Sequence, residues 1–513
     1  MKILTYSEEN LAEALSNKYT SPTLVKVKNH FDYFKKYLGS SGLDAKTILI
    51  EEDYISRDFL HDYASYYALC FEKYEKVCRR VHFFDIAVTE EEFSNKLLLP
   101  KEDTVEFWKH YVGFIVIKPI PLTMVGYTVL KTYSNNQDVN DRNFWGLRDY
   151  KIHLYGNEII LKSLAFQEQD SVLAACATTA IWSMLNKAAV DFHTILKSPS
   201  QITNDADKVS PDGSRLFPNK GLSILQISQA ILNSGLVSEI KEGDIRSHSY
   251  AYRVASIRYL KKIINAYSPI GIPIILVVRV PSGGDHGLHA ITVSGFKTLA
   301  PQPIPPQKAI SYMSDNIDRI YVHDDQWGPF ARVNLYNEAD LETPWTENDT
   351  VIPKRPTLVT NIVVPVYPKI RISYQDLEVI VVGLDRILTF FFDTQIVADL
   401  VWDIKIDYSE NYKHAIKNSG LDNGEKVQIL TESLPKYIWI ASCYVGVYKL
   451  FCFTFDATNI NNAMIGLNVV SFLPDTTRLT LIQFLKKNKL TLQYLFAHMA
   501  SEKYYEFLIE KLK

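Results

Sequence analysis

The chain has 513 residues, of which 47% are hydrophobic and 22% are charged, a composition typical of a globular protein. This length exceeds one ordinary hydrophobic core, so two or three domains are expected. The 55 basic and 58 acidic side chains give a formal charge of −3, which argues against a general nucleic-acid binder. No apolar run approaches the roughly 18 residues needed to cross a bilayer, so no membrane partner is expected.

The N-terminus and the cysteines indicate the compartment. Acidic residues occur within the first ten positions, which is not the pattern of a secretory signal. The five cysteines are few for this length and form no CxxC pair, so they support neither a zinc site nor a disulfide framework. We therefore expect a cytoplasmic protein with no metal and no cofactor.

The sequence divides into three expected regions, of which the first, residues 1–155, is an N-terminal α/β region of unknown role. Within it, 47–71 passes from a short strand into a helix, and 111–133 predicts two strands around a proline-bearing turn. Beyond it, alternating apolar residues on either side of Gly156-Asn157 predict a hairpin that turns at this pair.

The middle region, residues 156–355, is expected to be one domain. Apolar residues at helical spacing predict a helix that begins at Cys176. A long polar loop follows at about 197–221. A second helix is then expected, with Ser223 as its N-cap and Gly235 as its stop.

A third helix is expected within 249–267, and strands dominate after it. A proline-rich stretch, 300–307, joins two of these strands and is expected to be extended. Residues 356–513 form the third expected region, a C-terminal α/β region of unknown role. Its expected helices lie near 375–389, 409–418 and 490–512.

Cys176 is the first candidate for chemistry. It lies between Ala175 and Ala177, small residues that leave room for a substrate, where a helix is expected to begin. A helix N-terminus and a nearby imidazolium both lower the pKa of a thiol and so activate it as a nucleophile. A cysteine among alanines is by itself most often a small core residue, so the case depends on the partners that follow in the sequence.

A histidine and a carboxylate complete the set of roles that a cysteine hydrolase needs. His289 directly precedes an apolar strand, whereas His286 falls in a glycine-rich stretch and is the poorer general base. Asp324 and Asp325 end a later strand. Because side chains alternate along a strand, only one of the two is expected to reach His289. The apolar face favours Asp324, with Asp325 as the alternate.

Two glutamines lie upstream of the thiol. A side-chain amide placed there can complete an oxyanion hole together with the backbone N–H of the cysteine. Gln169 precedes Cys176 by seven positions and Gln167 precedes it by nine. Gln169 is the preferred donor and Gln167 is the alternate.

This constellation resembles the papain-like cysteine peptidase superfamily, nearest the bacterial peptidases that cleave after double-glycine leaders. The resemblance covers about 160–340 and rests on "CATTAIW" after Gln169, on "HAITVSGF" from His289 and on "YVHDDQWGPF". It implies Cys176 as nucleophile, His289 as general base, an aspartate at 324 or 325 as the orienting group and Gln169 as oxyanion donor. Where many relatives carry the glutamine, six residues before the thiol, this chain has Asp170.

The expected fold class is therefore α+β. A papain-like core, with a helical subdomain around Cys176 and an antiparallel sheet carrying His289, is flanked by the N- and C-terminal α/β regions. The expected function is a cytoplasmic cysteine protease that cleaves a peptide or isopeptide bond of a protein or peptide substrate through an acyl-enzyme. The flanking regions are expected to select the substrate or to await a regulatory protein partner. The alternatives are an acyltransferase such as a transglutaminase, and a non-catalytic scaffold that keeps the fold.

Overall fold

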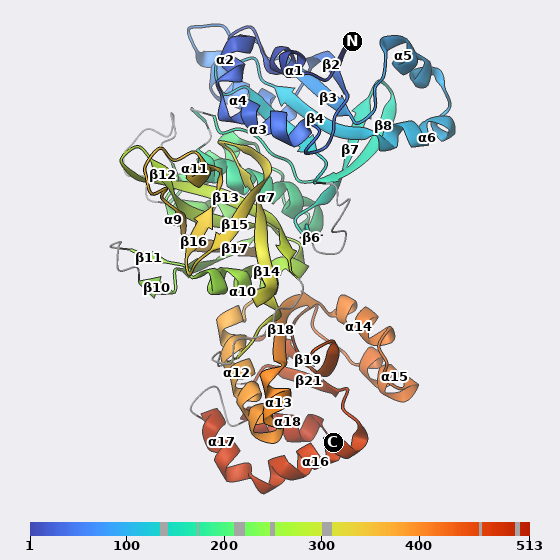
Figure 1. Cartoon of the computed structure of the whole chain (residues 1–513), viewed down its shortest axis with the longest axis vertical. Coiled ribbons are helices and arrows are strands. Elements are labelled where there is room, and N and C mark those ends of the chain that lie inside the picture. Colours follow the sequence, from blue (N-terminus) through green and yellow to red (C-terminus); the bar gives the residue numbers. More distant parts are fainter. Residues whose placement is uncertain are drawn as a thin grey trace. The chain divides into compact units, whose positions relative to one another are not determined.

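The computed structural model describes residues 1–133, 142–170, 172–173, 175–209, 221–246, 252–299, 310–460, 464–497 and 503–512. The protein is mixed helix and sheet, in agreement with the expected α+β class. The chain divides into two compact units (Figure 1). The first unit comprises 1–255, 271–297 and 319–365, and the second comprises 256–270, 298–318 and 366–513. The segment 256–270, expected in the middle region, thus belongs to the second unit.

The first unit begins with a five-stranded antiparallel sheet, in the order β1-β2-β3-β4-β5. Its strands are β1 (Lys2–Thr5), β2 (Thr47–Tyr54), β3 (Cys78–Phe84), β4 (Tyr111–Ile117) and β5 (Val125–Leu130). One face is apolar, with Ile48, Val81 and Ile115 in a buried cluster with helix residues such as Phe34. The helices that supply this cluster are α1 (Glu8–Leu15), α2 (Pro22–Lys26) and α3 (Asn29–Leu38).

Three helices and a hairpin complete the N-terminal part of this unit. The helices are α4 (Arg57–Ser65), α5 (Glu90–Leu98) and α6 (Lys101–Lys109), with a 3-10 turn η1 (Tyr67–Leu69). The short strand β6 (Arg142–Asn143) precedes the hairpin strands β7 (Arg148–Leu154) and β8 (Asn157–Ser163). The hairpin turns at Tyr155 and Gly156, both with positive φ, one residue earlier than the expected Gly156-Asn157 turn. The earlier turn pairs Leu154 with Asn157.

A helical part follows the hairpin in the sequence. Its helices are α7 (Cys176–Phe192), α8 (Pro199–Ala206) and α9 (Ile224–Asn233). Helix α7 begins at Cys176 as expected. Helix α8 forms within the expected polar loop because Ser198 and Gln201 make a capping box; 210–220 of that loop lie outside the described residues. The expected N-cap, Ser223, and the expected stop, Gly235 with φ +90, are both confirmed for α9.

The remaining part of the first unit is built on a larger sheet. Strands β12 to β17 pair in order, and β12 also pairs with β17, so these six strands close into a ring. The strands are β12 (Ile274–Ser282), β13 (Asp285–Thr298), β14 (Ile317–Asp324), β15 (Gly328–Tyr336), β16 (Asp340–Glu342) and β17 (Thr357–Val366). Smaller elements are β9 (Val237–Glu242), β10 (Ile245–Arg246), β11 (Arg253–Val254) and α11 (Pro344–Glu347). The proline-rich stretch 300–307 lies outside the described residues.

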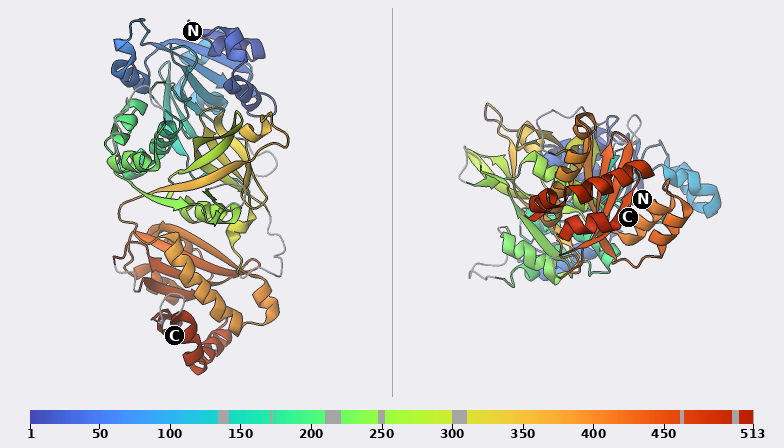
Figure 2. Two further views of the ribbon diagram at one scale, coloured as in Figure 1. Left: turned by 90° about the vertical axis from the view of Figure 1, so that its left-hand side faces the viewer. Right: turned by 90° about the horizontal axis from the view of Figure 1, so that it is seen from below.

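The second unit has a four-stranded antiparallel sheet with helices on both faces (Figure 2). The strands are β18 (Leu400–Tyr408), β19 (Tyr437–Val445), β20 (Tyr448–Asp456) and β21 (Gly466–Ser471). One face of the sheet packs against α14 (Ser409–Lys417) and α15 (Asn423–Thr431). On the other face, the Trp439 ring contacts Tyr267 and Tyr374, which lie on α10 (Ile257–Tyr267) and α12 (Tyr374–Phe391).

The remaining short elements of this unit are η2 (Ser268–Ile270), η3 (Met313–Asn316), α13 (Thr394–Ala398), α16 (Asp475–Lys487), α17 (Lys489–Ala497) and α18 (Lys503–Lys511). The helix expected near 490–512 is thus described as two helices, α17 and α18. Nowhere in the described part of the chain does a helix have both the length and the apolar character needed to cross a membrane.

Helix α3 holds the turn between β14 and β15. The hydroxyl of Tyr33 donates to the Pro329 carbonyl oxygen, and the Tyr33 ring stacks on Tyr37 at 5.7 Å between centroids. A Cβ built on Gly328 would lie 2.2 Å from a carbon of the Tyr33 ring. Glycine at 328 therefore permits the close approach between α3 and this turn.

The first prediction concerns this contact. Gly328→Ala should destabilise the first unit by about 1–3 kcal/mol, because the Tyr33 ring is held on its other side and cannot move away freely. Urea unfolding followed by circular dichroism measures the change. Gly284→Ala is the matched control, since a Cβ at 284 meets nothing within 4 Å. Equal stability of the two variants would show that α3 does not constrain the turn.

Candidate active site

Cys176 occupies the first position of α7. The N-cap residue is Ala175, which has no side chain able to cap the helix, so backbone N–H groups at this end remain available. The Cys176 side chain is partly exposed and borders a cavity of about 960 Å³. The thiol therefore lies at the positive end of a 17-residue helix and is open to a ligand in the cavity.

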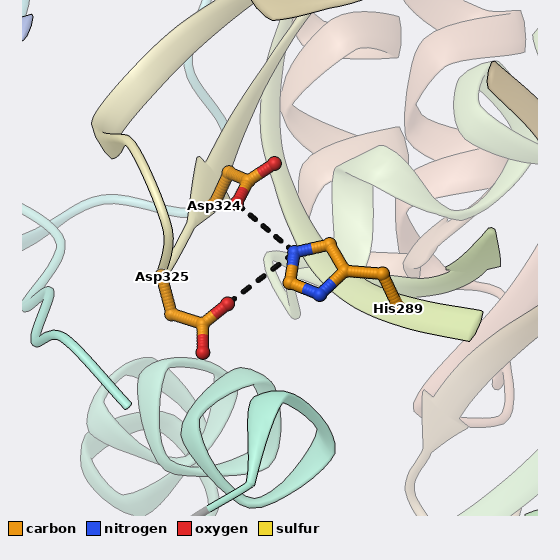
Figure 3. A group of neighbouring side chains, drawn as sticks. All are labelled: His289, Asp324 and Asp325. Carbon is orange, nitrogen blue, oxygen red and sulfur yellow. Dashed lines mark hydrogen bonds and ion pairs between the residues drawn. The ribbon is translucent and has the colours of Figure 1, made fainter. Parts of the chain in front are cut away.

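His289 lies on β13 and contacts two carboxylates (Figure 3). Its Nε2 lies 2.9 Å from Asp324 Oδ1 in a hydrogen bond, and 3.3 Å from Asp325 Oδ1. All three side chains are buried, with 3–6% of each exposed. His289 and Cys176 border the same cavity, and an interaction with the Cys176 side chain contributes to raising the pKa of His289. Because Nε2 faces the carboxylates, Nδ1 is the ring nitrogen left for the thiol.

The two aspartates do not point in opposite directions, so the expectation that only one reaches His289 is wrong. Strand β14 ends at Asp324, and its pairing with β15 shifts register between Val322 and Asp324. Asp325 is then part of the turn and no longer follows the alternation of the strand. Only Asp324 makes a hydrogen bond to the ring; among the described residues, neither oxygen of Asp325 has a hydrogen-bond partner.

Asp324 is held by three N–H donors. Besides His289, the backbone N–H of Gln326 donates to Oδ1 at 3.1 Å, and Trp345 Nε1 donates to Oδ2 at 2.9 Å. The Trp345 ring also meets the His289 ring edge to face, with 5.4 Å between centroids. Trp345 thus fixes the carboxylate and covers the imidazole. No feature of the local sequence marked this residue.

The charges of the group are strongly coupled. Burial by itself lowers the pKa of His289, but the charges of Asp324 and Asp325 and the hydrogen bonds to Asp324 and Cys176 outweigh it and raise that pKa well above 6.5. Burial raises the pKa of Asp325 to about 7, opposed by the His289 charge and assisted by that of Asp324. The surroundings of His289 therefore favour its protonated form.

The N-terminal part of the chain holds the turn that contains Asp325 through a hydrogen bond to its backbone. His30 Nε2 donates to the Asp325 carbonyl oxygen at 2.8 Å. Burial lowers the pKa of His30, with the Glu168 charge opposing it. Glu168 in turn forms an ion pair with Lys28 and accepts the Val125 N–H. His30 lies 295 positions before Asp325 in the sequence, so no local pattern could have indicated this contact.

The segment before Cys176 contains both expected oxyanion donors. Gln169 is half-buried and borders the same cavity as Cys176 and His289. Gln167 is 5% exposed and does not border that cavity; its Nε2 has no hydrogen-bond partner among the described residues. The structure therefore places Gln169, rather than Gln167, where a ligand at the thiol can meet it.

Asp170 organises this segment. One carboxylate oxygen accepts the N–H groups of Val172 and Leu173, and the other accepts the Tyr67 hydroxyl at 2.6 Å. Lys118 lies 3.9 Å from the same carboxylate. Asp170 therefore holds this segment in place. The neutral N–H donor that the segment presents to the cavity is the amide of Gln169.

The two other histidines near the site take no part in it. His286 lies on β13, not in a loop as expected, and its Nε2 contacts the Pro356 carbonyl oxygen at 3.1 Å. His323 is buried between the rings of Phe166 and Phe330. Burial lowers the pKa of His323 to about 3, so it is neutral.

His289, Asp324 and Asp325 also place three ligand atoms within 4.8 Å of one another, close enough to share a metal ion. Two features disfavour that use. Asp324 already accepts three N–H bonds, and His289 offers the carboxylates the same nitrogen that a metal would need. The arrangement fits a protonated imidazole between two carboxylates better than a metal site.

No protein-family model matches the chain, and a search of curated proteins finds no match. A functional assignment therefore depends on the geometry of the site.

The second prediction tests the contact between Cys176 and His289. At pH 6 iodoacetamide should alkylate Cys176 on the order of 10- to 100-fold faster in the wild type than in His289→Ala, because the variant lacks the imidazole that borders the same cavity as the thiol. His286→Ala is the matched control and should react at the wild-type rate. Mass spectrometry of the Cys176 peptide measures the rates. Equal rates in the wild type and His289→Ala would exclude the pairing.

The third prediction separates the two aspartates. Asp324→Asn should lower the pKa of His289, because both a charge and a hydrogen bond to the ring are lost. Asp325→Asn should lower it less, since only a charge without a hydrogen bond is removed. NMR titration of ¹³C-labelled histidine measures both, and His289→Ala assigns the signal. A larger shift in Asp325→Asn would make Asp325 the orienting group.

Proposed function

We propose that this protein is a cysteine peptidase with a papain-like catalytic core. The observation that carries the proposal is the chain of contacts from Cys176 through His289 to Asp324. In it a thiol at a helix N-terminus meets an imidazolium that a buried carboxylate holds in place. These are the roles of nucleophile, general base and orienting group in thiol-dependent acyl transfer.

The way in which the two parts of the first unit meet also supports this proposal. Cys176 comes from the helical part, whereas His289 and Asp324 come from the strands that close into a ring. The cavity of about 960 Å³ has walls from both parts and is large enough for several residues of a peptide. We infer a protein or peptide as substrate.

In the proposed reaction, the Cys176 thiolate attacks the carbonyl carbon of a peptide or isopeptide bond. The negative oxygen of the tetrahedral intermediate accepts hydrogen bonds from the Cys176 backbone N–H and the Gln169 amide. The His289 imidazolium gives its proton to the leaving amine, and a thioester forms. His289, now neutral, takes a proton from water as the water attacks the thioester, the carboxylic acid leaves, and the Cys176 thiolate and the His289 imidazolium are restored.

A non-catalytic scaffold that keeps the fold explains the site less well, because it gives no reason for a costly buried group. Asp325 remains buried beside His289 with no hydrogen bond to either oxygen from a described residue, and such burial is costly. Buried carboxyl groups with a raised pKa, such as Asp325, occur most often at functional sites. A cytoplasmic location is part of the proposal, since all five cysteines are free.

The fourth prediction tests the nucleophile. Cys176→Ala should reduce cleavage of a fluorogenic peptide library by roughly a thousandfold or more and leave thermal unfolding nearly unchanged, because one sulfur is removed at a partly exposed position. Cys70→Ala, which changes another partly exposed thiol, is the control and should keep full activity. Cleavage by Cys176→Ala at the wild-type rate would refute the proposal. Transfer of the acyl group to added amines in preference to water would identify a transferase instead.

A further inference from the structure

A second cavity, of about 570 Å³, lies in the first unit and shares no bordering residue with the cavity beside Cys176. One wall is the face of the β1–β5 sheet opposite to the apolar cluster with α1–α3; it carries Arg80, Phe114 and Tyr127. Strand β7 and the first turn of α4 form the other walls. Its volume is in the range of sites that bind small molecules.

The side chains around this cavity leave positive charge uncompensated. Four of them, Arg57, Arg80, Arg148 and Lys151, are cations, and two are carboxylates. The carboxylates are already engaged: Glu51 pairs with Arg80 at 2.6 Å and Asp58 pairs with Arg57 at 2.7 Å.

Lys151 lies 3.9 Å from Glu158 in an ion pair, so Arg148 is the cation that remains for a ligand. No ion pair joins it to a carboxylate of the described residues. Its guanidinium lies 4.0 Å from the centroid of the Tyr150 ring, and Nη2 donates to Asn186 at the long distance of 3.4 Å. Its buried Nε has no hydrogen-bond partner among the described residues. A guanidinium backed by an aromatic ring is well placed to bind an anionic group through its fork of N–H donors.

The sheet wall offers flat surfaces for a ring. The Arg80 guanidinium lies between two rings, 4.3 Å from the centroid of Tyr54 and 5.3 Å from that of Phe114. Phe114 and Tyr127 stack on each other with 5.9 Å between centroids. Stacked rings and guanidinium planes favour planar aromatic ligands.

We propose that this cavity binds a small organic anion that combines a phosphate or carboxylate with a flat aromatic ring. The anionic group pairs with Arg148, and the ring lies against Tyr54 and Tyr127. Mononucleotides and simple aryl phosphates share this chemistry and fit the volume.

The cavity is connected to the helix that begins at Cys176. Trp182 of α7 donates from Nε1 to Asp58 Oδ2 at 2.8 Å and meets the Tyr127 ring edge to face at 5.5 Å. Arg148 reaches Asn186 on the same helix. A bound ligand therefore stabilises α7, whatever the activity of the thiol.

Isothermal titration calorimetry on the full chain tests the proposal, with AMP, phenyl phosphate, benzoate and inorganic phosphate as probes. At least one of the three aromatic probes should bind, and inorganic phosphate should bind more weakly. Arg148→Met should weaken that binding by roughly tenfold or more, the loss expected for one charge-assisted pair. Arg79→Met is the control for removing one arginine, because Arg79 lies on β3 next to Arg80, pairs with Glu52 and does not border the cavity. Comparison of the affinity for AMP with the affinities for phenyl phosphate and benzoate distinguishes a nucleotide site from a site for a simple aromatic anion.

Two further variants keep the test valid if Arg148→Met fails to fold. Arg148→Lys retains the charge and should bind with intermediate affinity. Tyr54→Leu should weaken the aromatic probes and leave inorganic phosphate unchanged. Hydrogen–deuterium exchange should show protection in 51–58, 148–153 and α7. No heat with any aromatic probe, equal affinity in all variants, or binding without protection in these segments would overturn the proposal.

Discussion

The hydrogen bond between Asp324 and His289 is the interaction on which the candidate site depends. Both side chains are almost wholly buried, at 4% and 6% exposed, so neither charge is screened well by water. Such a pair stabilises a protein only if its geometry is exact and its other lone pairs are satisfied. The structure meets this condition with the N–H groups of Gln326 and Trp345. Asp325 has no such donors among the described residues, and burial raises the pKa of its carboxyl group to about 7.

That requirement explains why the N-terminal region belongs to the same compact unit as the site. The turn that presents both aspartates is held by α3, through His30 on the Asp325 carbonyl and Tyr33 on the Pro329 carbonyl. Glu168, two positions before Asp170 and close to the thiol in the sequence, binds Lys28 of the same region. The two halves of the candidate active site are thus both attached to residues 28–33.

Two cavities of the first unit differ in their chemistry. The cavity at Cys176 combines a nucleophile with a neutral amide donor, as peptide chemistry requires. The other combines arginine side chains with stacked rings, and no cysteine is among the described residues that border it. Helix α7 connects the two cavities. It begins at the thiol, and its Trp182 and Asn186 are hydrogen-bonded to Asp58 and Arg148, which border the second cavity. Stability of this helix is therefore a property that both sites share.

The sequence by itself determined the features that depend on neighbours along the chain. The start of α7 at Cys176, the cap Ser223 and the stop Gly235 follow from short-range patterns. The order of cysteine, histidine and aspartate could also be read from it, because Cys176 begins a patterned helix, His289 directly precedes the apolar part of β13 and Asp324 ends β14. The tertiary structure alone decided that both aspartates reach His289, since a register shift between β14 and β15 overrides strand alternation. The roles of Trp345, His30 and Arg148 also depend on the tertiary structure, because each residue contacts a partner that is distant in the sequence. A local sequence pattern cannot indicate such contacts.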